Sequence, residues 1–349
     1  MFKGCYTALI TPFLGITSSP EINWQGLEKL VKFQLSQGVN GILATGTTGE
    51  SPTLSWGEHN RVITVVSRLA NKQCQVIAGT GSNNTKETLE GTEWAVAAEV
   101  RTILLVDPYY NGPSSLEIRR EYIGPVAEKF PEVQIIPYII PGRTGTQLLA
   151  EDLAILHHTY PNVRAVKEAT GKIENMVRIR KLCGEDFDIL SGDDDKTWEM
   201  MTNQEIKASG VISVISNVAP KAIQEMTELL LAGNTREAEK IRKALQPLFE
   251  IVTVKTEEET PYGKVTCKAR NPLPIKTLMN ILGMPSGICR PPLGKMTAKG
   301  LQKVLSVART VYQNNPEILK PIEQFFLVDI AGRLEDKRTW QNLYYEGYS

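Results

Sequence analysis

The chain has 349 residues, of which 42% are hydrophobic and 22% charged, and its 39 lysines and arginines equal its 39 aspartates and glutamates. This composition is typical of a globular protein with a large core, and the balanced charge creates no overall field that would attract nucleic acid or a membrane surface. From the balanced charge we expect no nucleic-acid partner. No apolar run approaches the roughly 18 residues that a membrane-spanning helix needs, so we also expect no membrane.

The N-terminal residues and the cysteines indicate a cytoplasmic location. The first apolar run is short and stops at Thr11-Pro12, whereas a signal peptide needs a longer apolar region and a cleavage site of small residues. The cysteines are odd in number and far apart: Cys5, Cys74, Cys183, Cys267 and Cys289. This pattern favours a reducing compartment over a disulfide framework or a zinc site.

Short strand-like runs alternate with longer segments of helical periodicity over the first two thirds of the chain. In chain order the runs are CYTALITPF, GILATG, QVIAGTG, TILLVDPYY, VQIIPYIIP, VRAVKEATG, FDILSG and GVISVISN, followed respectively by helical segments at 26–37, 55–71, 85–99, 116–130, 148–160, 172–183, 195–206 and 219–232. Apolar runs with amphipathic crossovers predict parallel strands that are covered on both sides. Eight such units, with no GxGxxG after the first run, favour a closed (β/α)₈ TIM barrel over an open doubly wound sheet.

The domain organisation follows from where the strand signals stop. We expect a barrel at 1–232, a C-terminal helical region at 233–319 and a tail at 320–349, with helices at 235–250, 272–283 and 297–315. A polar insertion at 255–271 is either a loop or a small hairpin around Pro261–Gly263. The tail is too aromatic for a disordered end, so we expect it to dock on the rest of the chain.

In barrels of this kind the working residues lie at the C-terminal ends of the strands and in the loops that follow. Polar groups gather at those ends here: GTTGES (46–51), PYYNGPS (108–114), Tyr138 with PGRTG (141–145), Lys167, and SGDDD (191–195). These segments are therefore the candidates for a functional site.

Lys167 stands near the end of an apolar strand, VRAVKEATG. Alternate residues of a strand share one face, so Val163, Ala165 and Lys167 point to the same side. If that side lines the barrel, the amine is desolvated, is less often protonated and can attack a ketone to form a Schiff base. The alternative is a strand-end lysine that reaches solvent or pairs with Glu168.

The other polar groups each allow two interpretations. GTTGE suits a site for a carboxylate or phosphate, and it also suits an ordinary capped turn. Tyr138 either relays protons near an amine or is a core aromatic bonded to backbone, and Arg143 either grips a carboxylate or is solvated. Asp193–Asp195 alternate in direction and have no histidine nearby, so we expect them to cap a helix and expect no metal site.

Together the motifs resemble the dihydrodipicolinate synthase / N-acetylneuraminate lyase family of class I aldolase-like barrels. GTTGES, PYYNGPS, Y-x-x-PGRTG, VKEATG, LSGDD and GVIS stand in the order and spacing of that family. The resemblance runs from Gly4 to about 315 and excludes the insertion and the tail. It implies a synthase that condenses pyruvate with L-aspartate 4-semialdehyde on the diaminopimelate route to lysine, without a cofactor.

The resemblance also implies catalytic roles. Lys167 would condense with pyruvate, and the resulting enamine would attack the aldehyde. Tyr138, Thr47 and Tyr110 match the proton-relay triad of the family. The tyrosine that matches Tyr110 reaches into the neighbouring subunit, which implies a homo-oligomer, either a dimer or a tetramer.

Substrate-binding residues carry over in the same way. Thr48 matches the residue that binds the carboxylate of pyruvate, and Arg143 matches the one that binds the carboxylate of the semialdehyde. Gly192 and Ile212 would line the pocket. One departure from the family pattern is Ile139, which stands where the family usually has asparagine. Because neighbouring strand residues face opposite sides, we expect Ile139 to point away from Tyr138.

Two other functions compete with the synthase. One is a pyruvate-dependent aldolase for a 2-keto-3-deoxy sugar acid, against which Arg143 and Tyr110 argue. The other is a non-catalytic, ligand-binding relative. The intact side chains argue against it: Lys167, Tyr138, Thr47 and Tyr110.

A feedback site for L-lysine is a further implication of the resemblance. The matching positions are Ser51, Trp56, His59, Asn83, Glu87 and Tyr109. Glu87 suits the ammonium of a bound lysine, and Trp56 offers a cation–π face. The alternative is ordinary packing at a subunit interface.

Overall fold

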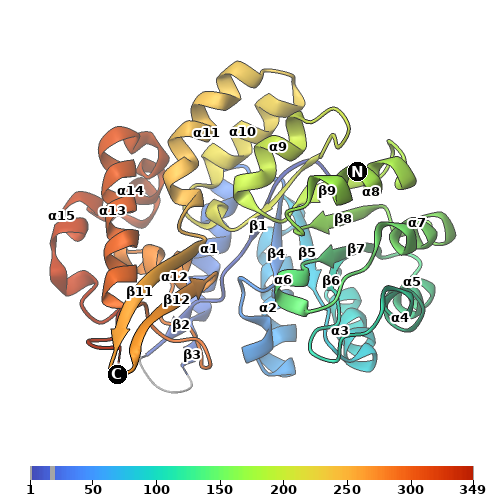
Figure 1. Ribbon diagram of the computed structural model, residues 1–349, viewed down its shortest axis with the longest axis horizontal. Coiled ribbons are helices and arrows are strands. Elements are labelled where there is room, and N and C mark those ends of the chain that lie inside the picture. Colours follow the sequence, from blue (N-terminus) through green and yellow to red (C-terminus); the bar gives the residue numbers. More distant parts are fainter. Residues whose placement is uncertain (1, 16–19, 349) are drawn as a thin grey trace.

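The computed structural model describes residues 2–15 and 20–348, and in it parallel strands close into a barrel (Figure 1). The barrel strands are β1 (Gly4–Ala8), β4 (Gly41–Ala44), β5 (Gln75–Gly79), β6 (Thr102–Val106), β7 (Gln134–Ile139), β8 (Ala165–Glu168), β9 (Asp188–Ser191) and β10 (Gly210–Ser213). They follow chain order around the barrel, and β10 pairs with β1 to close it. The predicted (β/α)₈ barrel is confirmed.

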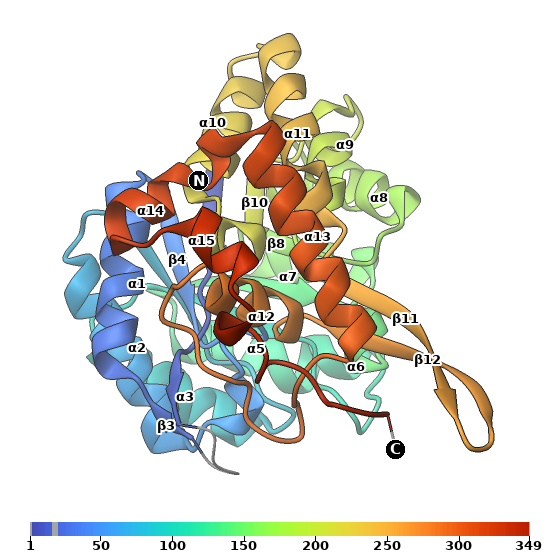
Figure 2. The ribbon, with the colours of Figure 1, turned by 90° about the vertical axis from the view of Figure 1, so that its left-hand side faces the viewer.

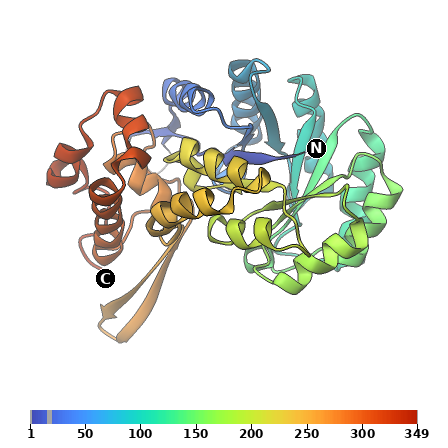
Figure 3. The same ribbon diagram turned by 90° about the horizontal axis from the view of Figure 1, so that it is seen from above.

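Helices connect successive strands and cover the outside of the barrel, which Figure 3 shows from above. These helices are α1 (Trp24–Ser36), α2 (Trp56–Ala70), α3 (Thr85–Ala97), α4 (Ser115–Glu117), α5 (Gly124–Lys129), α6 (Pro141–Thr144), α7 (Ala150–Thr159), α8 (Ile173–Cys183), α9 (Thr197–Thr202) and α10 (Pro220–Leu231). Short turns of helix, η1 (Ser51–Thr53), η2 (Ile118–Ile123), η3 (Asp194–Lys196) and η4 (Ile215–Asn217), and a small ribbon of β2 (Phe13–Leu14) and β3 (Glu21–Ile22) complete this part. The segment predicted as one helix at 116–130 is thus built from α4, η2 and α5.

The alternation of side chains along each strand separates two apolar clusters. Inside the barrel lie Tyr6, Ala8, Leu43, Ile77, Leu104, Ile136, Tyr138, Ala165, Leu190 and Ile212. The opposite faces of the strands, including Ile42, Ile103 and Ile139, pack against the surrounding helices. Both faces are therefore buried, which explains why the strands read as continuous apolar runs.

The C-terminal helical region contains α11 (Thr235–Phe249), α12 (Leu273–Ile281) and α13 (Ala298–Asn314). Between α11 and α12 the polar insertion forms an antiparallel hairpin of β11 (Thr253–Thr260) and β12 (Gly263–Arg270), so the hairpin alternative is the one observed. Figures 2 and 3 show the far end of this hairpin projecting away from the rest of the chain.

The tail docks on the body, as its aromatic content predicted. It contains η5 (Pro316–Ile318), α14 (Lys320–Phe326), α15 (Ile330–Glu335) and η6 (Lys337–Thr339). The rings of Phe325 and Phe326 in α14 lie 5.3 and 5.1 Å from the ring of Phe33 in α1, which is fully buried. Arg333 of α15 donates hydrogen bonds to the carbonyls of Asn280 and Ile281 at the end of α12. No helix in the described ranges is both long and apolar enough to cross a bilayer.

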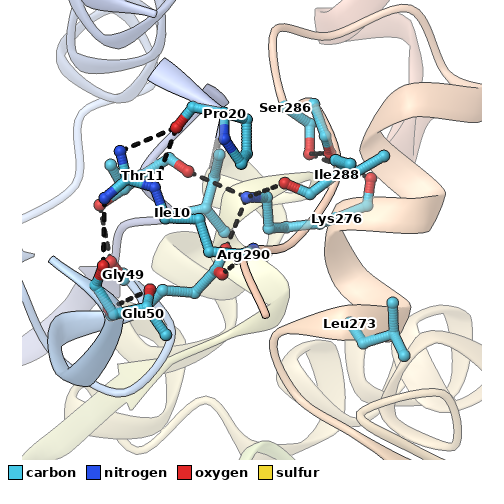
Figure 4. A network of polar contacts seen from close by, with 12 residues as sticks. Ile10, Thr11, Pro20, Gly49, Glu50, Leu273, Lys276, Ser286, Ile288 and Arg290 are labelled. Atoms are coloured by element: carbon cyan, nitrogen blue, oxygen red, sulfur yellow. Dashed lines mark hydrogen bonds and ion pairs between the residues drawn. The ribbon is translucent and has the colours of Figure 1, made fainter. Parts of the chain in front are cut away.

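A buried ion pair ties the C-terminal region to the barrel (Figure 4). The ammonium of Lys276 in α12 lies 2.6 Å from a carboxylate oxygen of Glu50, and both side chains are at most 1% exposed. Lys276 also donates to the carbonyls of Thr11 and Ile288, while the second oxygen of Glu50 accepts the backbone N–H of Arg290. Glu50 belongs to the GTTGES segment, so this network fixes one of the candidate site loops.

Replacing Lys276 by methionine is expected to lower the free energy of unfolding by about 3–5 kcal/mol, because it leaves a carboxylate buried without a countercharge. Equilibrium urea unfolding measures the loss. Lys32→Met is the matched control: Lys32 also forms a 2.6 Å pair, with Glu28, but the two side chains are 58% and 47% exposed. Such exposed pairs contribute less than about 1 kcal/mol. Equal losses in the two variants would contradict the role assigned to the buried pair.

Candidate active site

A cavity of about 250 Å³ opens at the mouth of the barrel, the end at which the strands finish. It is lined by Thr45, Gly46, Thr47, Ser51, Pro52, Gly79, Gly81, Leu104, Val106, Tyr109, Tyr138, Ile140, Arg143 and Thr144. The loop after β4 enters it in an uncommon conformation, since Thr45 and Glu50 have left-handed φ angles of 55° and 57°. Non-glycine residues in this region are strained and persist only where neighbours hold them. Thr45 is held by a hydrogen bond from its hydroxyl to the carbonyl of Gly79.

Lys167 and Tyr138 meet at this mouth. The two residues are register partners in the parallel pair of β7 and β8. Each side chain is 5% exposed, and Lys167 Nζ lies 4.2 Å from the centroid of the Tyr138 ring. Lys167 therefore points into the barrel, and the alternative of a solvated strand-end lysine does not fit its burial. Tyr138 lines the cavity, and burial raises its pKa above the ordinary value.

Burial also changes the protonation of Lys167. It lowers the pKa of the amine to about 8, because a buried ammonium loses its hydration, and nearby Arg143 acts in the same direction. The carboxylates of Asp193 and Asp194 oppose this shift without cancelling it. At pH 7 about one amine in ten is then neutral and nucleophilic, far more than for an ordinary lysine with a pKa near 10.4.

Gly192 provides the space that Lys167 occupies. A methyl group at this glycine would lie 2.8 Å from Cβ of Ala169 and 3.2 Å from Cε of Lys167. The backbone N–H of Gly192 donates to the carbonyl of Glu168, which keeps the two segments close. A side chain at this position would displace the amine.

The end of the hairpin completes the site. Asn271 follows β12 directly, and its Nδ2 donates to the hydroxyl of Thr48 over 3.0 Å. Arg143 Nη2 donates to the carbonyl of Asn271 over 2.9 Å. Asn271 Oδ1 is buried and accepts no hydrogen bond from the described residues. Thr48, Arg143 and Asn271 thus form one connected group of hydrogen-bonding side chains at the mouth.

Comparison with known proteins identifies the family. The sequence profile of the Dihydrodipicolinate synthetase family matches residues 1–311. A curated relative from Geotalea daltonii, named 4-hydroxy-tetrahydrodipicolinate synthase, is 38% identical over 309 residues, which are 88% of this chain and 98% of the relative. The chain belongs to this family.

Two solved structures of the family share the fold. Dihydrodipicolinate synthase from Cyanidioschyzon merolae with lysine bound is 34% identical with a TM-score of 0.79, and the match covers 89% of this chain and 98% of that one. The chloride-inhibited enzyme from Acinetobacter baumannii, complexed with pyruvate, is 32% identical with a TM-score of 0.79, and the match covers 89% and 99% of the two chains. The predicted family, barrel and synthase activity are confirmed, and the chain is a lyase of the class I aldolase type.

The remaining residues predicted from the family lie in different surroundings. Thr47 lines the cavity and is half-buried. Tyr110, in contrast, is 90% exposed and does not line the cavity of its own chain. Ile212 lies outside the cavity lining and packs in the apolar cluster inside the barrel. Ile139 packs on the opposite face of β7 from Tyr138, as strand alternation predicted.

The residues predicted to bind lysine surround the starts of α2 and α3. The rings of Trp56 and His59 lie 4.9 Å apart, and burial lowers the pKa of His59 to about 4, so its ring is neutral. Glu87 accepts a hydrogen bond of 2.6 Å from the hydroxyl of Ser82. The pKa of Tyr109 is raised by burial and by the charge of Glu87. Ser51 and Tyr109 line the cavity, and Asn83 is exposed.

The prediction that the acidic run after β9 caps a helix is wrong. The side chain of Asp193 makes no capping hydrogen bond to η3. The carboxylate of Asp194 instead turns inward. It accepts hydrogen bonds from the hydroxyl of Ser213 and from the backbone N–H groups of Val214 and Ile215, at the start of η4. The end of β10 and the start of η4 supply these donors, and only the folded barrel brings them to Asp194. Within residues 2–15 and 20–348, no three His, Cys, Asp or Glu side chains are arranged to hold a metal ion.

Asn271 and the Glu50–Lys276 pair were not among the residues that the sequence predicted. The sequence offers one signal for Asn271, a lone polar residue ahead of the two prolines of NPLP at the start of a helix. No spacing rule connects Glu50 with Lys276, because they lie in separate elements that only the tertiary structure brings together.

Labelling of Lys167 is expected to rise with pH around its lowered pKa of about 8, because only the neutral amine attacks a carbonyl. Reductive methylation with formaldehyde and cyanoborohydride, followed by peptide mass spectrometry between pH 6 and about 10, measures the rate at each lysine. The rate at Lys167 should climb to pH 8 and flatten above it. Lys86, whose side chain is 83% exposed in α3, is the internal reference. A Lys167 profile parallel to that of Lys86 would contradict the assignment.

Proposed function

We propose that Lys167 of this chain forms the Schiff base of a 4-hydroxy-tetrahydrodipicolinate synthase reaction, which joins pyruvate to L-aspartate 4-semialdehyde on the diaminopimelate route to lysine. The observation that carries the proposal is the buried amine of Lys167 beside the Tyr138 ring, with a pKa lowered to about 8. An amine desolvated in this way is a nucleophile for the keto group of a small acid. The pyruvate complex of the Acinetobacter baumannii relative supports this choice of acid.

The chemistry proceeds on Lys167, which stays covalently bound to the substrate from the first step to the last. The neutral amine adds to the keto carbon of pyruvate, and loss of water gives the protonated Schiff base. Removal of a methyl proton converts it to an enamine, whose carbon attacks the aldehyde and forms the new carbon–carbon bond. The amino group of the condensed semialdehyde then adds to the Schiff-base carbon, which closes the ring and expels the amine of Lys167.

Hydroxyl groups move the protons in these steps. Tyr138 has its ring centroid 4.2 Å from the amine of Lys167 and lines the cavity with Thr47. We assign Tyr138 and Thr47, with Tyr110 from a neighbouring copy of the chain, to a relay between the substrate and bulk water. The raised pKa of Tyr138 keeps the phenol protonated, so it can donate a proton when water is lost.

The carboxylates of the two substrates are assigned to different partners. Thr48 offers its hydroxyl to pyruvate, and Arg143 offers a guanidinium to the semialdehyde. Their shared hydrogen-bonding partner, Asn271, holds both at the mouth. Gly192 leaves room for the Schiff base, and Ile212 forms part of the apolar wall beneath it.

Borohydride trapping with pyruvate is expected to leave a pyruvate-derived mass on the peptide that contains Lys167. Lys167→Ala should give no adduct and no turnover. Tyr138→Phe removes the proton relay but not the amine, and should lower kcat by about 10²–10⁴-fold. Turnover with L-aspartate 4-semialdehyde and with a 2-keto-3-deoxy sugar acid separates the synthase from a sugar-acid aldolase. A folded chain that forms no adduct would overturn the proposal in favour of a ligand-binding relative.

An oligomer completes the relay in this proposal. Tyr110 has a left-handed φ of 78° and is 90% exposed, a costly arrangement for a tyrosine on a free surface. Leu116 and Leu149 are also exposed, by 49% and 46%, in the segments that follow β6 and β7. We propose that this surface meets a second copy of the chain, in a dimer or a tetramer. The division of the chain at 232 and 319 and the cytoplasmic location stay predictions of the sequence.

Feedback by L-lysine is proposed at the residues around Trp56 and Glu87. The support is the lysine-bound Cyanidioschyzon merolae relative together with two local features. Glu87 is half-buried and carries a carboxylate for an ammonium, and Trp56 is 37% exposed, so its ring face is accessible to a cation.

Glu87→Gln is expected to weaken inhibition by L-lysine about tenfold or more, since a hydrogen bond to a charged group contributes about 1.5–3 kcal/mol. The measurement is the lysine concentration that halves the synthase rate. Glu90→Gln is the control and should leave inhibition unchanged, because Glu90 lies one turn further along α3 and its side chain is exposed. Inhibition of the same strength in both variants would place the lysine site elsewhere.

A further inference from the structure

The hairpin of β11 and β12 has two unlike faces. On one face Val254, Thr256 and Glu258 are buried toward the C-terminal helices, and Val254 lies close to Gly300 of α13. Lys303 of α13 donates to the carbonyl of Lys255 over 2.6 Å, which further fixes the hairpin to the body. The hairpin therefore holds its other face in a defined position.

The other face carries cations at the end nearest the barrel mouth. Lys255 and Lys268 are directly opposed register partners, and Arg270 follows on the same face two residues later. All three are exposed. Arg270 Nη1 donates to the carbonyl of Gly142 over 3.0 Å. Gly142 directly precedes Arg143 of the candidate site. We call Lys255, Lys268, Arg270 and Arg143 the cationic strip.

The charges of the strip repel one another. Like charges directly opposite each other destabilise a hairpin. The pKa of Lys268 is lowered first by Arg270 and also by Lys255 and Arg143, so the four charges act on one another. Among residues 2–15 and 20–348 none of the four forms an ion pair. An arrangement that works against hairpin stability points to an anion that these cations attract.

The acidic residues of the same face lie toward the hairpin tip instead. Glu257 accepts the hydroxyl of Thr266, and Glu259 pairs with Lys264 at 3.4 Å. On this face the tip therefore carries two carboxylates, Glu257 and Glu259, and one ammonium, Lys264, while the base next to the mouth carries only cations. A hairpin face that only contacts solvent does not require its carboxylates at the tip and its cations at the base. The strip also ends in the site itself, since Asn271 follows Arg270 and bonds to Thr48.

We propose that the cationic strip attracts the anionic keto acid substrate, pyruvate, from solvent and delivers it to the mouth of the barrel. The inference rests on the proposed function, in which pyruvate is an anion with one net negative charge, whereas the ammonium of the semialdehyde cancels its carboxylate. Charge of one sign beside a cleft raises the local concentration and the association rate of an oppositely charged ligand by about 10–10³-fold, and salt screens the effect. The strip acts before covalent chemistry, so it changes kcat/KM and leaves kcat nearly unaltered.

The test is the ionic-strength dependence of kcat/KM for pyruvate in Lys268→Glu. At about 10 mM ionic strength kcat/KM should fall about three- to tenfold, and at about 0.5 M the difference should shrink below about 1.5-fold. Lys268→Gln removes one charge instead of reversing it and should show about half the effect on a logarithmic scale. The new carboxylate in Lys268→Glu faces Lys255, so this variant replaces a repulsive pair by an attractive one and the hairpin stays folded.

Lys264→Glu is the matched control. It makes the same charge change on the same face of β12, but about 13 Å farther from the mouth. At about 0.15 M ionic strength the Debye length is about 8 Å, so there Lys264→Glu should leave kcat/KM unchanged while Lys268→Glu still lowers it. Equal effects of Lys264→Glu and Lys268→Glu, or a loss that salt does not remove, would overturn the strip while leaving the synthase function intact. Absence of turnover and of a pyruvate adduct in the unchanged chain would overturn both.

Discussion

The buried ion pair of Glu50 and Lys276 is the constraint on which the candidate site depends. Glu50 ends the same turn that carries Thr47 and Thr48, and Lys276 lies in α12, outside the barrel strands. A carboxylate and an ammonium at this depth are stable only in each other's presence, so the turn cannot move independently of α12. Since α12 begins at Leu273, shortly after Asn271, the same pair also sets where the asparagine meets the hydroxyl of Thr48. The helical region is therefore part of the active-site architecture.

Around this anchor the barrel supports several locally unfavourable features. An amine is buried at Lys167, Thr45 adopts a left-handed backbone, and two lysines oppose each other on the hairpin. Each of these lowers stability, and each lies at or beside the mouth. The strands beneath are buried on both faces and provide the surplus of apolar packing that tolerates them. Features that lower local stability cluster at functional sites, and their clustering at the mouth is typical of such a site.

The sequence predicted the features that depend on local pattern. Strand alternation put Lys167 on one face with Val163 and Ala165, and turned Ile139 away from Tyr138, but it left open whether the Lys167 face lines the barrel. Aromatic content was enough to predict a docked tail. The features it did not predict depend on segments that are distant along the chain. Asp194 satisfies donors on η4 and not its own helix, Lys276 finds Glu50 across the fold, and Asn271 reaches Thr48 from the end of an insertion. No periodicity encodes such pairings, because each is decided by how whole elements pack.

The docked tail has a consequence for how the protein is made. Phe33, in the first helix, is covered by Phe325 and Phe326, which are synthesised 292 residues later (325 − 33). Chains emerge at about 5–20 residues per second, and domains fold from the N-terminus onward. During the fifteen seconds or longer that separate these residues at such rates, a finished barrel would carry an exposed aromatic ring on α1. A chain cut short before residue 325 would keep that ring exposed, which marks incomplete molecules for chaperones and proteases.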